Sequence, residues 1–212
     1  LLERDQLTSG TTWHAAGLVS QLGPTAAVTK IRKYTLDLYK KLEKEVDHSA
    51  GLRINGALSI AQTDDRWQEL KRQATTAQLY NVDIKILDRE ALKKNYPMMQ
   101  TDDLKGGVLM PGDGAADPSG VTHMLAKAAR KGGAKIFEQS PVENILIKNG
   151  IVEGVIVKGK KIDCEYVVLA TGMWSRQIGE KIGVSIPLYP AEHFYVITEP
   201  IEDLSKTLPV IR

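Results

Sequence analysis

The spacing of apolar residues predicts four helices. Between residues 25 and 46 apolar positions recur every three or four residues and lysines occupy the other face, which predicts an amphipathic helix packed on a sheet. Asp64 and Asp88 can each cap a further helix, and Asp117 followed by Pro118 offers an N-cap and a first-turn proline for a fourth. The apolar residues of the first helix are Val28, Ile31, Leu38, Leu42 and Val46, and those of the second are Trp67, Leu70, Ala74 and Ala77.

Alternation of apolar and polar residues predicts strands elsewhere in the chain. Three of these strands follow one another through glycine-containing turns, which predicts a meander. After Pro187 the alternation resumes through His193, Tyr195 and Ile197, and Leu208 begins another strand at the end of the sequence. The predicted strands before Pro187 cover residues 52–61, with an interruption at Asn55-Gly56, and residues 106–110, 143–148, 151–157 and 162–170.

The changes of period along the chain predict an α/β fold with two interleaved domains. Leu1 and Leu2 have the character of the end of a buried parallel strand, and residues 166–172 read as a buried strand that ends in small residues. We predict the first domain from residues 1–50 and 111–187, and a second domain, built on an antiparallel sheet, from residues 51–110 and 188–212.

The composition is that of a globular protein and excludes several classes of function. The 212 residues are 42% hydrophobic and 25% charged, which is ordinary for a folded domain. The formal charge of +2 is too small for an electrostatic footprint on nucleic acid. No apolar run reaches the roughly 20 residues that cross a bilayer. The single cysteine, Cys164, excludes an internal disulfide and suits a reducing compartment.

Asp113 and Asp117 are the acidic residues that most invite a metal interpretation. Their spacing fits no calcium-binding loop, and a turn at Asp113 with a helix cap at Asp117 explains both residues. We therefore predict no metal site.

The first eighteen residues have the composition of a nucleotide site. Glu3 follows a predicted strand, where an acidic side chain can accept hydrogen bonds from a ribose, although a solvated strand end has the same composition. Residues rich in hydroxyl groups, with Gly10 and Gly17, then surround Trp13 and His14 and would let the backbone approach a pyrophosphate. Spacing alone is more typical of a structural role for His14.

Residues 1–18 closely resemble the segment that carries covalently bound FAD in the dimethylglycine and sarcosine dehydrogenase family. They read Leu-Leu-Glu-Arg-Asp-Gln-Leu-Thr-Ser-Gly-Thr-Thr-Trp-His-Ala-Ala-Gly-Leu. The resemblance implies an FAD-binding dinucleotide fold interleaved with a substrate domain. No G-x-G-x-x-G turn precedes Leu1, so we expect an internal piece of a longer chain, without the first strand and glycine turn of that fold. The resemblance recurs at Pro111-Gly-Asp-Gly, Asp117-Pro, Ala170-Thr-Gly-Met-Trp and Glu192-His-Phe-Tyr-Val-Ile-Thr-Glu.

The resemblance also implies roles for individual residues. His14 matches the histidine that is joined through a ring nitrogen to the ring methyl of the flavin. Glu3 and Arg4 would lie at the adenosine, Val142 would contact the adenine through its backbone, and Trp174 would lie near the flavin. The other residues implied to line the cofactor are Gly10, Thr11, Thr12, Trp13, Ala15, Ala16, Gly17, Leu18, Ala170 and Gly172.

The implied reaction is the transfer of a hydride from the N-methyl group of sarcosine or dimethylglycine to FAD. The resulting iminium would be captured by water or by a folate bound to another domain of a longer parent. Electrons would pass to an electron-transfer flavoprotein or to oxygen. By the same resemblance the strand after Pro187 covers the amine-binding face of the flavin, which makes His193 the second catalytic candidate. A histidine bonded within the sheet is the alternative.

Two other functions are compatible with these residues. One is an amino acid oxidoreductase of the same fold with non-covalent FAD, and the other is a non-catalytic regulatory subunit related to the family. We expect a cytoplasmic protein if the source is bacterial and a mitochondrial matrix protein if it is eukaryotic.

Overall fold

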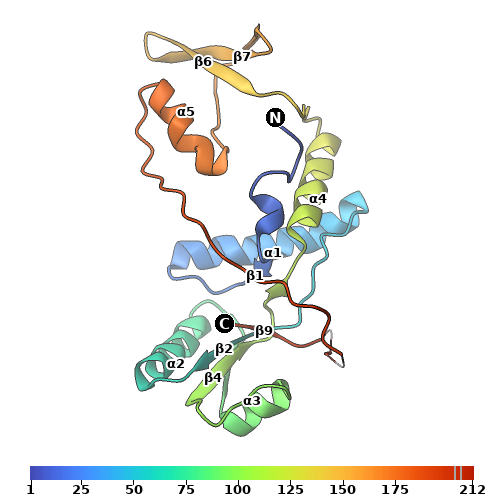
Figure 1. Cartoon of the computed structure of the whole chain (residues 1–212), viewed down its shortest axis with the longest axis vertical. Coiled ribbons are helices and arrows are strands. Elements are labelled where there is room, and N and C mark those ends of the chain that lie inside the picture. The colour runs from blue at the N-terminus through green and yellow to red at the C-terminus, as the bar shows by residue number, and fades with distance from the viewer. Residues whose placement is uncertain (203, 206) are drawn as a thin grey trace. The chain divides into compact units, whose positions relative to one another are not determined.

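The computed structural model describes residues 1–202, 204, 205 and 207–212. The chain forms two compact units, which Figure 1 shows in colours that follow the sequence. The first unit contains Leu1–Gln6 and Lys135–Ile201, and the second contains Leu7–Ala134 and Glu202–Arg212. No helix among the described residues is long and apolar enough to cross a bilayer. The domain boundaries inferred from the sequence stay a prediction.

Two long helices of the second unit, α1 (Ala26–Val46) and α4 (Pro118–Lys131), confirm their predicted positions. The side chain of Thr25 caps α1, and Asp117 caps α4 by accepting two backbone N–H groups. The helices share a buried cluster of Val46, Ala50 and Met124.

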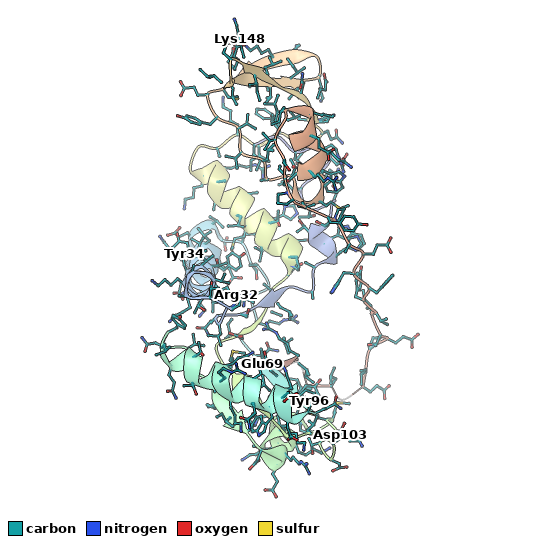
Figure 2. All side chains as sticks on the ribbon, turned by 90° about the vertical axis from the view of Figure 1, so that its left-hand side faces the viewer. Arg32, Tyr34, Glu69, Tyr96, Asp103 and Lys148 are labelled. Carbon is teal, nitrogen blue, oxygen red and sulfur yellow. The ribbon has the colours of Figure 1, made fainter. Side chains whose placement is uncertain are left out.

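The prediction that Ile31 lies on the buried face of α1 is wrong. Its side chain is 64% exposed, and that of its neighbour Tyr34, which Figure 2 labels, is 67% exposed. The buried stripe of the helix runs instead through Thr29, Leu36 and Val46.

A four-stranded mixed sheet fills the rest of the second unit, in the order β3 (Lys85–Leu87), β4 (Gly106–Met110), β2 (Ala57–Ala61) and β9 (Val210–Ile211). The first three strands are antiparallel, and β9 joins β2 in parallel. Helices α2 (Asp64–Gln78) and α3 (Arg89–Asn95) cover opposite faces of the sheet (Figure 1). Consecutive residues of a strand face opposite sides, so Ala61 packs with α2 while Leu58 packs with α3.

Two predicted boundaries in this sheet region change. The strand predicted from residue 52 begins at Ala57, because Gly56 adopts a positive φ of 89° and Arg53 forms an isolated bridge with Ala115. The cap of α2 is Thr63 and not Asp64, because the Thr63 hydroxyl accepts the N–H of Arg66.

The first unit contains the predicted meander, formed by β6 (Val142–Lys148), β7 (Ile151–Val157) and β8 (Lys160–Asp163). The turn between β6 and β7 follows Lys148, which Figure 2 labels. A short 3-10 turn, η2 (Gly172–Trp174), leads into α5 (Ser175–Lys181).

The prediction of a strand through residues 162–170 is wrong beyond Asp163, and so is that of a buried strand from residue 166. Residues 164–171 lie in no strand, because none of the described segments supplies the ladder of backbone hydrogen bonds that a strand requires. The burial of successive side chains still alternates along this segment. Val167 and Leu169 pack on the meander, whereas Val168 between them is 86% exposed. Cys164, predicted inside this strand, lies just after β8 and is half-buried.

The strand predicted through His193, Tyr195 and Ile197 is also absent. Residues 188–201 lie outside helices and strands, and the side chains of His193 and Ile197 are exposed. Apolar alternation needs a partner strand before it becomes a sheet, and the described residues provide none here.

Candidate functional site

Glu3 is fixed through its backbone by the segment that follows α4. Leu2 forms an isolated parallel bridge with Phe137, which matches the predicted strand in direction. The prediction that this strand end is buried is wrong for Leu1, whose side chain is 67% exposed. The N–H of Glu3 donates to the carbonyl of Phe137 at 2.8 Å, and its carbonyl accepts the N–H of Ser140 at 2.8 Å. The carboxylate of Glu3 accepts the N–H of Asp5 at 2.9 Å and remains partly exposed. An acidic group is therefore presented at the end of a parallel bridge, where a ribose can be held.

Arg4 and Trp174, two of the residues implied at the cofactor, lie together in the first unit. The guanidinium carbon of Arg4 lies 4.5 Å from the centroid of the Trp174 ring, within the range of a cation–π contact. Arg4 also pairs with the carboxylate of Asp5 at 2.8 Å. Trp174 ends the turn η2, and α5 follows directly.

The other implied residues of the first unit, Val142, Ala170 and Gly172, are all exposed. Val142 starts β6 and is 37% exposed, and Ala170 is exposed. Gly172 has a positive φ of 53°, and a Cβ atom there would meet nothing within 4 Å. All three residues are therefore open to solvent.

In the second unit, Trp13 and His14 form an exposed pair of rings on the 3-10 turn η1 (Thr12–His14). The ring centroids lie 3.6 Å apart with an interplanar angle of 33°. The backbone N–H of His14 donates to the carbonyl of Thr11, which closes the turn. Trp13 is 55% exposed, so the pair presents aromatic surface to a ligand. Around it, Gly10 and Thr12 are half-buried, and Thr11, Ala15 and Ala16 are exposed.

Gly17 and Leu18 connect this turn to the body of the second unit. Gly17 has a φ of 71°, and its carbonyl accepts the N–H of Ala116 at 2.8 Å. Leu18 then begins β1 (Leu18–Val19), which pairs antiparallel with β5 (Gly114–Ala115). The turn that carries His14 is thus attached to a paired segment only four residues further along the chain.

These residues fit a flavin dinucleotide in their chemistry. A carboxylate at a parallel bridge suits a ribose, exposed small residues let a pyrophosphate approach the backbone, and exposed aromatic rings suit a planar ring system. His14 would hold the flavin, while Glu3, Arg4 and Trp174 would serve the adenosine and flavin sides as the resemblance implies. Among the described residues no group of three or more His, Cys, Asp or Glu side chains is placed to hold a metal ion.

The chain belongs to the family of FAD-dependent oxidoreductases known as DAO, whose model matches residues 1–211. Among curated relatives, it is 38% identical over 218 residues to human mitochondrial sarcosine dehydrogenase and covers 24% of that protein. It is 36% identical over 212 residues to the formaldehyde-forming 4-methylaminobutanoate oxidase of Paenarthrobacter nicotinovorans, of which it covers 26%. It is 34% identical over 215 residues to dimethylglycine dehydrogenase of Rattus norvegicus, of which it covers 25%. All three alignments span 100% of this chain, which is about a quarter of the length of these relatives.

The fold agrees with this family. The solved structure of L-proline dehydrogenase from P. horikoshii is 27% identical and aligns with a TM-score of 0.80, over 86% of this chain and 48% of that one. The predicted FAD-binding α/β fold is therefore confirmed.

Asp113 has a role that the sequence does not reveal. The sequence predicts a turn residue, whereas the structure buries the side chain of Asp113 completely. A Pro-Gly-Asp-Gly motif signals a turn, but it does not say that two other segments cross beside that turn.

Proposed function

We propose that this chain is part of an enzyme that oxidises an N-methyl amino acid, with FAD held covalently through His14. The observation that carries the proposal is the exposed Trp13-His14 pair on a turn anchored at Gly17, in a chain of the FAD-dependent oxidoreductase family. The names of the three relatives above describe N-methyl compounds, which supports an N-methyl amine as the substrate class.

FAD supplies the chemistry of this reaction by accepting the hydride that leaves the N-methyl carbon. The chain supplies binding and orientation. His14 fixes the flavin end of the cofactor, and Glu3, held at its backbone by Phe137 and Ser140, holds the adenosine end through the ribose.

A second role in this proposal falls to His193. An N-methyl amino acid carries a proton on nitrogen near neutral pH, yet its lone pair must assist departure of the hydride. A histidine, with an ordinary pKa of about 6.5, can accept that proton without adding permanent charge. We propose that His193 does so. We propose an electron-transfer flavoprotein or oxygen as the acceptor, and a folate as an optional acceptor of the one-carbon unit in a longer parent.

Acid precipitation of the FAD-loaded protein tests the covalent link. A bond between His14 and the flavin survives unfolding, so the flavin should precipitate with the protein, and His14→Ala should release it to the supernatant. His123→Ala removes another exposed histidine, on α4, and should keep the flavin bound. Acid-stable flavin in the His14→Ala variant would remove His14 from this role. Complete release of flavin from the parent protein would favour the non-covalent alternative.

A further inference from the structure

Asp113 is the only charged residue among the described residues that is completely buried, and it lies where three segments of the second unit meet. It belongs to the connection of residues 111–117 between β4 and α4. On one side this connection pairs with residues 17–21. On the other side, Ala115 of this connection exchanges backbone hydrogen bonds with Arg53, and the carbonyl of Asp113 accepts the N–H of Gly56.

The contacts with residues 17–21 extend along the whole connection. Ala116 donates its N–H to Gly17, and β5 pairs with β1. Gly112 lies so close to Gln21 that a Cβ atom on the glycine would come within 2.1 Å of the Gln21 side-chain nitrogen. Residues 17–21 are therefore clamped at both ends and in the middle.

The side chain of Asp113 makes the contact at Gln21, the far end of residues 17–21. Its Oδ1 accepts the backbone N–H of Gln21 at 2.9 Å, while its backbone carbonyl accepts the N–H of Gly56 at 2.8 Å. Its Oδ2 makes no hydrogen bond of normal geometry within the described residues, although the Gln21 side chain lies near enough to favour the ionised carboxyl. A single residue thus ties the exit of the His14 segment to the entry of the mixed sheet.

A carboxyl group is a costly choice for a purely structural link. Burial raises the pKa of Asp113, and the hydrogen bond from Gln21 with the more distant charges of Arg212 and Arg32 offsets only part of that effect. Because Oδ1 of Asp113 accepts the backbone N–H of Gln21, it fixes both the direction and the distance of that backbone group. Hydrophobic packing at this position would not fix both.

We propose that Asp113 is a positioning residue for the cofactor, which holds residues 17–21 through the N–H of Gln21 and so sets the position of the turn that carries His14. The inference rests on the proposed function, because it gives His14 the role of flavin attachment. Six residues lie between His14 and Gln21, and the path of this segment is fixed by the contacts at Gly17, β1 and Gln21.

The experiment compares three variants of the FAD-loaded protein. Asp113→Asn keeps an oxygen that can accept the Gln21 N–H, whereas Asp113→Leu has similar size and no acceptor. Asp117→Ala is the matched control, because Asp117 lies on the same connection and caps α4 without bonding to residues 17–21. The measurements are the fraction of acid-stable FAD, the visible circular dichroism of the bound flavin, and hydrogen exchange of the Gln21 amide.

Asp113→Asn should keep acid-stable FAD within about twofold of the parent and leave the flavin dichroism unchanged. Asp113→Leu should lower acid-stable FAD about tenfold and speed exchange of the Gln21 amide by about tenfold or more, because a hydrogen bond to a carboxylate is lost. Asp117→Ala should lower thermal stability and leave both flavin signals unchanged. Folded Asp113→Leu protein with parental flavin signals and parental Gln21 exchange would overturn the proposal.

A second variant covers the case in which Asp113→Leu does not fold. Gly112→Ala places a methyl group against the Gln21 side chain and keeps the Asp113 carboxylate in the sequence. It should change the flavin dichroism, and an unchanged spectrum would contradict the proposal. If the parent itself holds no acid-stable FAD, the proposed function fails, and Gln21 exchange in the Asp113 variants still decides whether Asp113 positions this segment.

Discussion

The two histidines proposed to serve the flavin lie in segments that are held in different ways. His14 lies on a 3-10 turn, three residues before Gly17 and its bond to Ala116. His193 lies among residues 189–201, which are exposed and pair with no strand of the described chain. In both segments the order of apolar or small residues favours a role at the cofactor. We infer that backbone pairing, and not the sequence pattern alone, fixes where a side chain lies.

Gly17→Ala should give the largest effect on the well-held segment. Gly17 has a φ of 71°, and an added Cβ would lie 2.1 Å from the carbonyl oxygen of Ala116. Strain and overlap together should lower the free energy of unfolding by about 3 kcal/mol or more. Gly133→Ala is the matched control, because Gly133 has a φ of 92° with nothing within 4 Å of a Cβ, and it should cost about 1 kcal/mol. Equal losses of unfolding free energy in urea denaturation would mean that Gly17 does not pack tightly against the carbonyl of Ala116.

His193→Asn tests the segment around His193, which pairs with no strand among the described residues. In FAD-loaded protein that contains the complete substrate site, it should slow flavin reduction by roughly 10²-fold, the lower end of general acid–base contributions. It should also alter the acidic limb of the pH profile. Stopped-flow kinetics provide the measurement, with His123→Asn as the control on a different element. Reduction within a few-fold of the parent, with an unchanged pH profile and intact covalent FAD, would assign His193 a structural role.

Asp117→Ala tests the N-cap of α4, which follows the residues that contact residues 17–21. The carboxylate accepts the N–H groups of Ser119 and Gly120 at the start of α4. Loss of this cap should lower the free energy of unfolding by about 1 kcal/mol. Thermal unfolding of the parent and of Asp117→Asn, which can still cap the helix, sets the scale. A loss as large as that predicted for Gly17→Ala would show that Asp117 does more than cap.

The pH dependence of stability gives the smallest and most specific signal. Burial raises the pKa of Asp113 above its ordinary value of 3.8, so the folded protein binds this proton more tightly than the unfolded chain. The contribution of Asp113 to stability should therefore fall as the pH rises from about 3.8 through the pKa of the folded protein, and then level off.

Asp113→Asn removes this titration, so its stability relative to the parent should improve as the pH rises through that interval. Urea denaturation of both proteins at closely spaced pH values measures the difference. A difference that stays constant with pH would show that the carboxyl titrates alike in the folded and unfolded protein.

Helices were predictable from this sequence because their determinants are local. Thr25 begins the predicted helix at residue 25, and Asp117 with Pro118 begins another, as the structure confirms. The turns of the meander were predictable for the same reason. The family was predictable from residues 1–18, because their order closely resembles a segment of that family, and the family model confirms the membership.

The failures share one physical cause. The strand through His193 was predicted from alternation, and the strand beyond Asp163 from a run of apolar residues that ends in small ones. Neither pattern reports the presence of a partner strand. The burial of Asp113 depends on Gln21 and Gly56, which are far away in the sequence. Non-local contacts of this kind leave no signal in the spacing of residues.

Peptide mapping of the FAD-loaded protein tests the central claim most directly. Cleavage after Arg4 and Lys30 releases a peptide of residues 5–30, in which His14 is the only histidine. We expect this peptide, analysed by mass spectrometry after acid denaturation, to carry the added mass of the flavin nucleotide, with fragment ions that place it on His14. An unmodified peptide from protein that still retains its flavin after denaturation would contradict the account, because the cofactor would then be attached elsewhere.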